Sequence, residues 1–208
     1  MYLSRLTLDT QSGQVRRDLA NRYDLHATLC WAFEDHDQAH PLWLMELTRP
    51  GEAPCLLVQS LAAPDWGRLA GRHAGYFLAH ESKELDLSKG LRAGQRLRFR
   101  LEANPTVTRE GKRHGLWQEE EQLAWLNRQG QQNQQGDRGG FAVESVVVTR
   151  QDRLVLQKHN RVQRIILYAV LFDGYLAVRD PVLFGQAIRT GIGHGKALGL
   201  GLLSLGPG

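Results

Sequence analysis

The sequence predicts an α+β protein that consists of two halves with the same order of elements. Both halves contain segments in which apolar and polar residues alternate, a pattern typical of half-buried strands. Segments with helical periodicity lie between them, and residues such as Pro, Gly and Asn mark the turns. In each half we expect the order strand, helix, strand, strand, helix, strand.

In the first half, the alternating segment YLSRLTL predicts a strand over 2–8, and a helix is expected over about 22–35. TRPGEAP predicts a turn between two further strands, because Pro and Gly favour turns. PDWGRLAG is expected to hold a short helix. The remaining strands of this half are predicted over 42–47, 55–61 and 75–80.

In the second half, QRLRFRLEA predicts a strand over 95–103 with its large apolar residues on one face and its arginines on the other. NPTVTREGKRHG is expected to be a loop. QEEEQLAWLNRQ favours a helix over 118–129, because its acidic first turn stabilises the positive end of the helix dipole. The glycine-rich segment GQQNQQGDRGG predicts another loop. Segments rich in β-branched residues predict strands over 141–149 and 164–172.

Asp173 and Gly174 then predict a two-residue turn, after which DGYLAV continues the strand pattern. A helix should follow, with Asp180 as its N-cap, Pro181 in its first turn and Gly191 at its end. ALGLGLLSL supplies a last strand. The repeated order is that of the ferredoxin-like fold. We therefore predict two tandem ferredoxin-like (RRM-like) domains.

The predicted domains cover 1–92 and 93–208. The composition, with 42% hydrophobic and 23% charged residues, is that of an ordinary globular protein. No apolar run approaches the roughly 18–20 residues that span a bilayer, and no secretory signal is visible. The cysteines, Cys30 and Cys55, lack the spacing of metal ligands. We expect a cytoplasmic protein that does not enter a membrane.

Positive charge is concentrated in two parts of the chain. The net charge is only +4, but Lys and Arg clearly outnumber Asp and Glu in 89–113 and in 150–164. Clustered cations near strands are an electrostatic footprint for a polyanion. A solvated basic face explains the same pattern, and charge alone does not separate the two interpretations.

The helix expected near residue 22 carries two polar rings. Asn21 is a suitable N-cap, and Asp24 is placed to complete a variant of the capping box. At 3.6 residues per turn, Tyr23, His26 and Cys30 share one side of this helix.

The apolar stripe Leu25, Leu29, Ala32 and Phe33 lies roughly a quarter-turn away. The dipole at the start of a helix disfavours a cationic imidazole, which would help His26 exchange a proton near neutral pH. From the residues alone, a hydrogen-bonded structural pair is the stronger interpretation of Tyr23 and His26.

The tail GIGHGKALGLGLLS, residues 191–204, is rich in glycine. It is not a P-loop, because Thr190 and Ala197 stand where that motif needs Gly and Ser or Thr. It is not a dinucleotide-binding loop, because a helix precedes it and a strand follows. Successive glycines can expose N–H groups to a phosphate or allow close packing, and the two uses are compatible.

Taken together, several segments resemble the CasE family, the CRISPR-associated endoribonucleases that cut precursor CRISPR RNA for the type I-E Cascade complex. These segments are MYLSRLTL, YDLHATL, LRFRLEANP followed by GKR, EEEQLAWL, AVLFDGYL and GIGHGKALGLGLLSLGP. The resemblance runs almost end to end. It implies two ferredoxin-like domains and metal-independent cleavage beside a repeat hairpin, in which the ribose 2′-hydroxyl attacks phosphorus and leaves a 2′,3′-cyclic phosphate.

The resemblance also implies roles for individual residues. Tyr23 and His26 match the catalytic tyrosine and histidine, with His26 the better proton carrier because imidazole titrates near pH 6.5 and phenol near 10. The basic hairpin that engages the RNA stem corresponds to 153–164. The candidate RNA-binding residues are Arg153, Lys158, Arg161 and Arg164, followed by Lys112, Arg113 and Lys196. We expect no metal site and no cofactor.

The expected partners are the CRISPR repeat stem-loop and other Cascade subunits. The chain departs from the family pattern at Ala27 and Cys30, where some relatives carry polar or basic residues, and at His194, where relatives often have Pro. If the cleavage site needs a further cation near the phosphate, its donor is not evident. Two alternatives remain open: a non-catalytic subunit that binds RNA hairpins, and a metal-dependent nuclease. EDHDQAH (34–40) could hold a metal, but is more consistent with a solvated turn.

Overall fold

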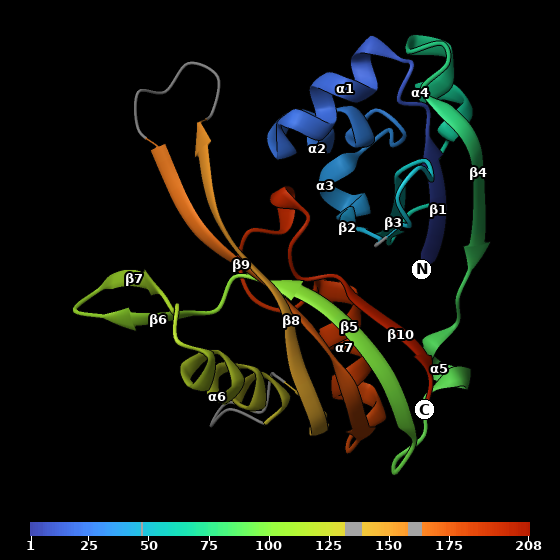
Figure 1. Cartoon of the computed structure of the whole chain (residues 1–208). Helices are drawn as coiled ribbons and strands as arrows, with labels where there is room; N and C mark the ends of the chain where they lie inside the picture. The colour runs from blue at the N-terminus through green and yellow to red at the C-terminus, as the bar shows by residue number, and fades with distance from the viewer. Residues whose placement is uncertain (47, 132–138, 158–163) are drawn as a thin grey trace. The chain divides into compact units, whose positions relative to one another are not determined.

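The computed structural model describes residues 1–46, 48–131, 139–157 and 164–208, and of 156–157 and 164–165 only the backbone. The chain divides into two compact units (Figure 1). The first comprises Met1–Leu85 together with Lys196–Gly199, and the second comprises Asp86–Gly195 and Leu200–Gly208. The predicted border lay near residue 92, and the return of Lys196–Gly199 to the first unit was not part of the prediction.

The first unit is a four-stranded antiparallel sheet with helices against its apolar face. Its strands occur in the spatial order β2-β3-β1-β4. Their bounds are β1 Tyr2–Leu8, β2 Leu42–Met45, β3 Cys55–Ser60 and β4 Phe77–Glu84. The helices are α1 Gly13–Ala20, α2 Arg22–Cys30, α3 His36–Ala39 and α4 Trp66–Arg72. The core contains Leu6, Val58, Leu25, Leu29 and Trp66, each at most 3% exposed.

The helix predicted over 22–35 is wrong in its extent, and helix α1 was missed. Asn21 is extended, at φ −139° and ψ 107°, and ends α1 while it caps α2. Helix α1 has only eight residues, and of these only Val15 and Asp18 are buried, so its sequence offers few apolar positions from which to predict a helix. The charged Asp18 is held in the interior by the Tyr76 hydroxyl, which donates to its carboxylate at 2.6 Å. Helix α2 ends at Cys30, where the backbone tightens into a turn.

The second unit repeats the topology of the first. Its sheet has the order β10-β5-β9-β8, again antiparallel throughout. The strands are β5 Arg96–Ala103, β8 Phe141–Gln157, β9 Arg164–Val178 and β10 Leu203–Pro207, and β6 Thr106–Arg109 pairs with β7 Lys112–Gly115 in a separate hairpin. The helices are α5 Leu87–Gly90, α6 Glu119–Gly130 and α7 Pro181–Thr190. In both sheets the first strand lies between the third and the fourth, which confirms the predicted ferredoxin-like fold.

Several local predictions in this unit are confirmed. Phe99 and its apolar neighbours on β5 are buried while Arg96 and Arg98 are exposed. Asp180 caps α7 by accepting from two backbone N–H groups, and Gly191 ends the helix at φ 73°. The loop predicted over NPTVTREGKRHG is instead the β6–β7 hairpin, closed by two residues of positive φ.

The turn predicted at Asp173 and Gly174 is wrong, because β9 runs straight through both residues. Opposite them the pairing register of β8 shifts between Val143 and Ser145, which marks a bulge. A Cβ on Gly174 would overlap the carbonyl oxygen of Ser145. Gly174 is therefore present for close backbone approach rather than for a turn. Figure 1 shows β8 and β9 extending beyond the end of β5 as a two-stranded arm.

The last predicted strand, ALGLGLLSL, is only partly correct. Lys196–Leu198 form a short 3-10 helix, η1, and strand pairing begins only at Leu203. Gly199 and Gly201 between them have φ values of 72° and 95°, which are incompatible with a strand. Among the described helices, none has the length and hydropathy that a bilayer crossing requires.

We expect Gly174→Ala to destabilise the protein by about 1–3 kcal/mol or more, because its methyl group would collide with fixed backbone. Urea unfolding followed by circular dichroism measures the change. Gly206→Ala is the matched control, since Gly206 lies in β10 of the same sheet and a Cβ there meets no atom within 4 Å. Equal unfolding midpoints for the two variants would contradict this account of Gly174.

Candidate functional site

Helix α2 presents four polar side chains on one side. Arg22, Tyr23, His26 and Cys30 fall within about a third of a turn of one another at 100° per residue, and all are half-buried. The neighbouring apolar stripe, which includes Leu25 and Leu29, is buried in the core as predicted. We call the four residues the α2 stripe.

The predicted cap of α2 is confirmed and fixes the start of the stripe. The Asn21 side-chain oxygen accepts from the Tyr23 backbone N–H at 3.0 Å. The amide of the same side chain donates to the Asp24 carboxylate, also at 3.0 Å. Tyr23 is thereby held in the first turn, and His26 follows one turn later.

His26 has two ring nitrogens in different surroundings. Its Nε2 lies 3.7 Å from the Cys30 sulfur, a weak hydrogen-bonding distance. Its Nδ1 is buried and has no hydrogen-bond partner within the described part of the chain. An unsatisfied buried nitrogen costs about 1–3 kcal/mol.

Burial lowers the pKa of His26, and the positive charges of His36 and His40 lower it further. The imidazole is therefore neutral at pH 7 and able to accept a proton. Burial raises the pKa of the Cys30 thiol to about 11, so Cys30 is a neutral neighbour and not a nucleophile. His36 and His40 belong to EDHDQAH. No three His, Cys, Asp or Glu side chains within the described ranges are grouped as metal ligands.

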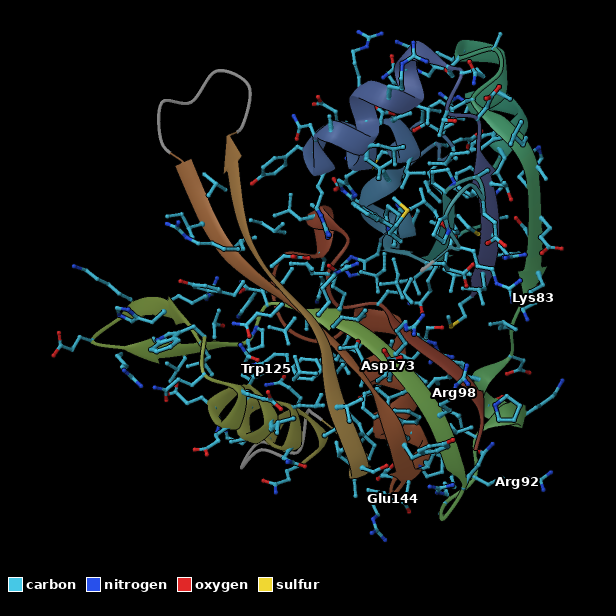
Figure 2. The ribbon with its side chains drawn as sticks, in the orientation of Figure 1. Lys83, Arg92, Arg98, Trp125, Glu144 and Asp173 are labelled. Atoms are coloured by element: carbon cyan, nitrogen blue, oxygen red, sulfur yellow. The ribbon has the colours of Figure 1, made fainter. Side chains whose placement is uncertain are left out.

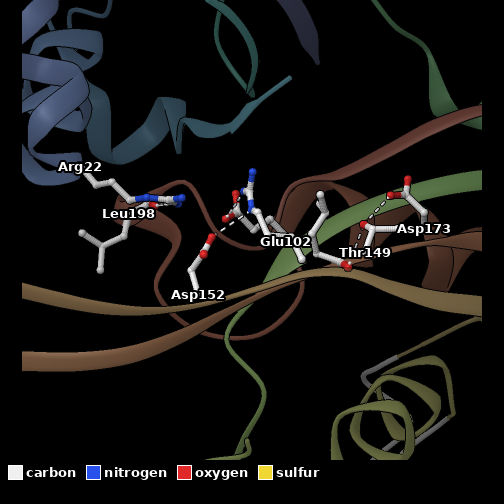
Figure 3. Close-up of polar contacts among 8 residues, drawn as sticks. Arg22, Glu102, Thr149, Asp152, Asp173 and Leu198 are labelled. Atoms are coloured by element: carbon white, nitrogen blue, oxygen red, sulfur yellow. Dashed lines mark hydrogen bonds and ion pairs between the residues drawn. The ribbon is translucent and has the colours of Figure 1, made fainter. Parts of the chain in front are cut away.

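The glycine-rich tail contributes η1 to the same unit. Arg22 donates from Nη1 to the Leu198 carbonyl oxygen at 2.8 Å (Figure 3). Lys196, predicted as an RNA-binding residue, is the first residue of η1 and is half-buried. Sequence reasoning missed Arg22, although its position four residues before His26 was a signal that both lie on one side of a helix.

Many cations of the two basic segments are paired within the second unit. Cross-strand ion pairs hold Arg96 to Glu144 at 2.7 Å and Arg100 to Asp173 at 2.8 Å. Figure 2 labels Glu144 on β8 and Asp173 on β9, the carboxylates of these two ion pairs. Arg150 contacts the buried Glu102 at 2.9 Å, with Asp152 beside it (Figure 3). The simple charge count therefore overestimates the basic footprint.

Three predicted RNA-binding residues lie on exposed parts of two strands of the second unit. Lys112 and Arg113 lie on β7, and Arg153 lies on β8; all are exposed without an ion pair to a described residue. Arg153 faces Tyr168 across the strands, and a Cβ on Gly115 of β7 would lie 3.1 Å from a Tyr168 ring carbon. The β6–β7 hairpin is thus packed beside the arm. Of the other predictions, Lys158 and Arg161 lie outside the described residues, and only the backbone of Arg164 is described.

Comparison with known proteins identifies the family. A family model described as "CRISPR associated protein" matches residues 1–207. The chain belongs to this CRISPR-associated family. It is 38% identical to the CRISPR-associated endoribonuclease Cse3 of Thermus thermophilus, with both chains covered completely. It is 29% identical to the CRISPR system Cascade subunit CasE of Escherichia coli, again over the full length of both.

Among solved structures, Thermus thermophilus Cse3 bound to an RNA representing a pre-cleavage complex is similar, with a TM-score of 0.85 and 36% identity. The match covers 99% of this chain and 98% of that chain. The resemblance to the CasE family inferred from the sequence is therefore confirmed. The relatives share the tandem ferredoxin-like fold with this member of the family.

We expect His36→Gln to raise the pKa of His26 toward its ordinary value of 6.5, because the substitution removes one of the like charges that act on it. The pKa remains below 6.5, since burial is the largest cause of the shift. An NMR titration of the histidine ring signals measures both values. His73→Gln is the control, since His73 is not among the groups that shift His26. A fall in the His26 pKa would contradict this electrostatic account.

Proposed function

We propose that this chain is a metal-independent endoribonuclease that cleaves precursor CRISPR RNA next to the repeat stem-loop. It remains bound to its product as a subunit of Cascade, in the cytoplasm. The names of its relatives, an endoribonuclease and a Cascade subunit, support the activity and the assembly. The single observation that carries the proposal is the neutral, half-buried His26, with an unpartnered Nδ1, one turn from Tyr23.

The chemistry requires two proton transfers and one exchange of bonds at phosphorus. The ribose 2′-oxygen forms a bond to the adjacent phosphorus while the bond to the 5′-oxygen breaks. A base takes the 2′ proton, and an acid protonates the departing 5′-oxygen. The products are a 2′,3′-cyclic phosphate and a 5′-hydroxyl, so atoms and charge balance without water or a metal.

Within this scheme His26 is the base, because its lowered pKa keeps the imidazole unprotonated at neutral pH. Tyr23 orients the reacting groups or donates to the departing oxygen through its hydroxyl. The partly exposed stripe allows a ribose–phosphate linkage to reach both rings. Cys30 remains a thiol and supports the position of the imidazole through the Nε2 contact.

The RNA stem is bound through shape and phosphates, as is usual for A-form duplexes. Arg153, Lys112 and Arg113 are predicted RNA-binding residues that are exposed in the described part of the chain. Lys158, Arg161 and Arg164 complete the predicted set. The hairpin and the arm would contact the same face of the stem because they are packed together through Gly115 and Tyr168.

We expect His26→Ala to slow cleavage of repeat RNA by about 10²–10⁴-fold with little change in affinity, because a proton carrier is lost while the binding surface remains. Tyr23→Phe should show a smaller loss of rate. Single-turnover assays with mapping of the cut and its end groups measure the effect. His80→Ala, an exposed histidine on β4, is the control.

The same assays measure how the cleavage rate depends on pH. Cleavage by the wild type should fall as the pH drops through the His26 pKa, below 6.5, since only the neutral ring accepts a proton. EDTA should leave the rate unchanged. Tight hairpin binding with no product at any pH would instead identify a non-catalytic RNA-binding subunit, and loss of cleavage with EDTA a metal-dependent nuclease.

Neutralising Arg153, Lys112 and Arg113 to Gln should weaken stem binding and flatten its dependence on salt. Counterion release lowers log affinity by roughly 0.7–0.9 per phosphate contact for each unit of log salt. Fluorescence anisotropy at several salt concentrations gives the slope. Arg5→Gln is a matched control, because Arg5 is already paired with Glu46 at 3.1 Å on the first sheet. An unchanged slope in the triple variant would show that these three residues do not contact the RNA phosphates.

A further inference from the structure

We infer that Trp117 is a stacking site for an unpaired nucleobase of the repeat RNA, beside Arg153 of the arm. This inference rests on the proposed function and adds a residue that was not among the predicted RNA-binding residues. Trp117 lies in the short segment between β7 and α6 and is 62% exposed (Figure 1). A single exposed tryptophan is common on protein surfaces and does not by itself mark a site. Its support and its neighbours distinguish this one.

Three hydrogen bonds fix the backbone that carries the indole. The Leu116 N–H donates to the Pro105 carbonyl oxygen at 2.9 Å, and the Leu116 carbonyl oxygen accepts from the side-chain amide of the buried Gln122 at 3.1 Å. The Trp117 carbonyl oxygen accepts from the side-chain amide of Gln151 at 2.9 Å. The ring is therefore presented by a fixed backbone, and less conformational entropy is lost when a ligand binds to it.

The hydrogen bond from Gln151 places Trp117 beside one face of the arm. Side chains two residues apart on a strand point to the same face, so Gln151 and Arg153 share a face of β8, about 7 Å apart. Tyr168 lies opposite Arg153 on β9, and its ring packs against Gly115, two residues before Trp117. Trp117 and Arg153 therefore lie on the same side of the arm.

The charges near Trp117 favour a base rather than a phosphate at the indole. Arg153 is exposed and suited to a phosphate. By contrast, Glu119 and Glu120 follow Trp117 in the first turn of α6, and both are exposed. Carboxylates repel phosphates, but they accept hydrogen bonds from the exocyclic amino groups of bases. A nucleotide with its phosphate toward Arg153 and its base on Trp117 matches both kinds of charge.

The base has to be unpaired, because bases inside a duplex are already stacked on their neighbours. In RNA recognition, the unpaired bases of loops and strand ends stack on aromatic side chains. A stem-loop supplies such bases at two places, in its loop and in the strands that flank the stem. Both places offer the same chemistry to Trp117, so the experiment has to distinguish them.

Trp117→Ala should weaken binding of repeat RNA by about 5- to 140-fold, which corresponds to the loss of one stacked base. The dependence of affinity on salt should stay that of the wild type, because stacking releases no counterions. Fluorescence anisotropy at several salt concentrations measures both quantities. Trp117→Phe should recover part of the affinity, since it keeps an aromatic face. Val182→Ala is the control, because Val182 is 70% exposed on α7 of the same unit.

Modified RNAs identify the base. Abasic nucleotides are placed at one unpaired position at a time, first in the loop and then in the flanks. Wild-type binding should weaken at the position that stacks on Trp117. With that RNA, Trp117→Ala should cause no further loss, since the contact is already missing. 2-Aminopurine at the same position should be quenched in the wild-type complex and brighter in the complex of Trp117→Ala.

The outcomes separate this inference from the proposed function. Wild-type affinity of Trp117→Ala, with cleavage intact, would overturn the stacking site and leave the endoribonuclease unaffected. An equal loss of affinity for intact RNA and for every abasic RNA would also overturn it, because the tryptophan would then support the fold and not a base. A wild-type protein that does not bind repeat RNA would overturn both.

Discussion

The hydrogen bond from Arg22 to the Leu198 carbonyl oxygen, at 2.8 Å, holds the glycine-rich tail on the helix that carries Tyr23 and His26. It ties four residues near the end of the chain to a helix near its beginning. Glycine is required at the next position, because the backbone has positive φ and lies flat on the Trp43 ring. Glycine at position 199 is thus a consequence of close packing.

In the second unit, several Arg side chains of the basic segments form ion pairs with nearby carboxylates. On the exposed face of an antiparallel sheet, residues directly opposite one another lie close enough to form ion pairs. Arg100 on β5 pairs in this way with Asp173, directly opposite it on β9, whereas Arg96 reaches Glu144 on β8, one strand further away. Among the described residues, exposed cations without an ion pair include Lys112 and Arg113 at the β6–β7 hairpin, Arg153 on β8 and Arg98 on β5. Which cations form ion pairs therefore depends on the register of the strands. A count of charged residues along the sequence does not give this register.

Sequence periodicity predicted both sheets, because alternation and strand order depend on local pattern and on which face is buried. It also predicted the apolar stripe of α2 and the cap at Asn21. It failed where tertiary contacts decide the local structure. Helix α1 is held by a buried hydrogen bond from Tyr76 to Asp18, and Gly174 lies close to a bulge in the neighbouring strand β8. Neither Tyr76 nor the bulge in β8 can be identified from the residues that flank Asp18 and Gly174 in the sequence.

The sequence predicted the candidate site less directly than the fold. The residues alone favoured a structural role for Tyr23 and His26, and only the family resemblance raised them to catalytic candidates. The structure adds a physical reason, since a half-buried imidazole with a lowered pKa is prepared to accept a proton. If His26 begins the reaction unprotonated, it cannot at that moment protonate the departing oxygen. A second donor must therefore be present, and we assign this role to the Tyr23 hydroxyl, about one turn before His26 on the same side of α2.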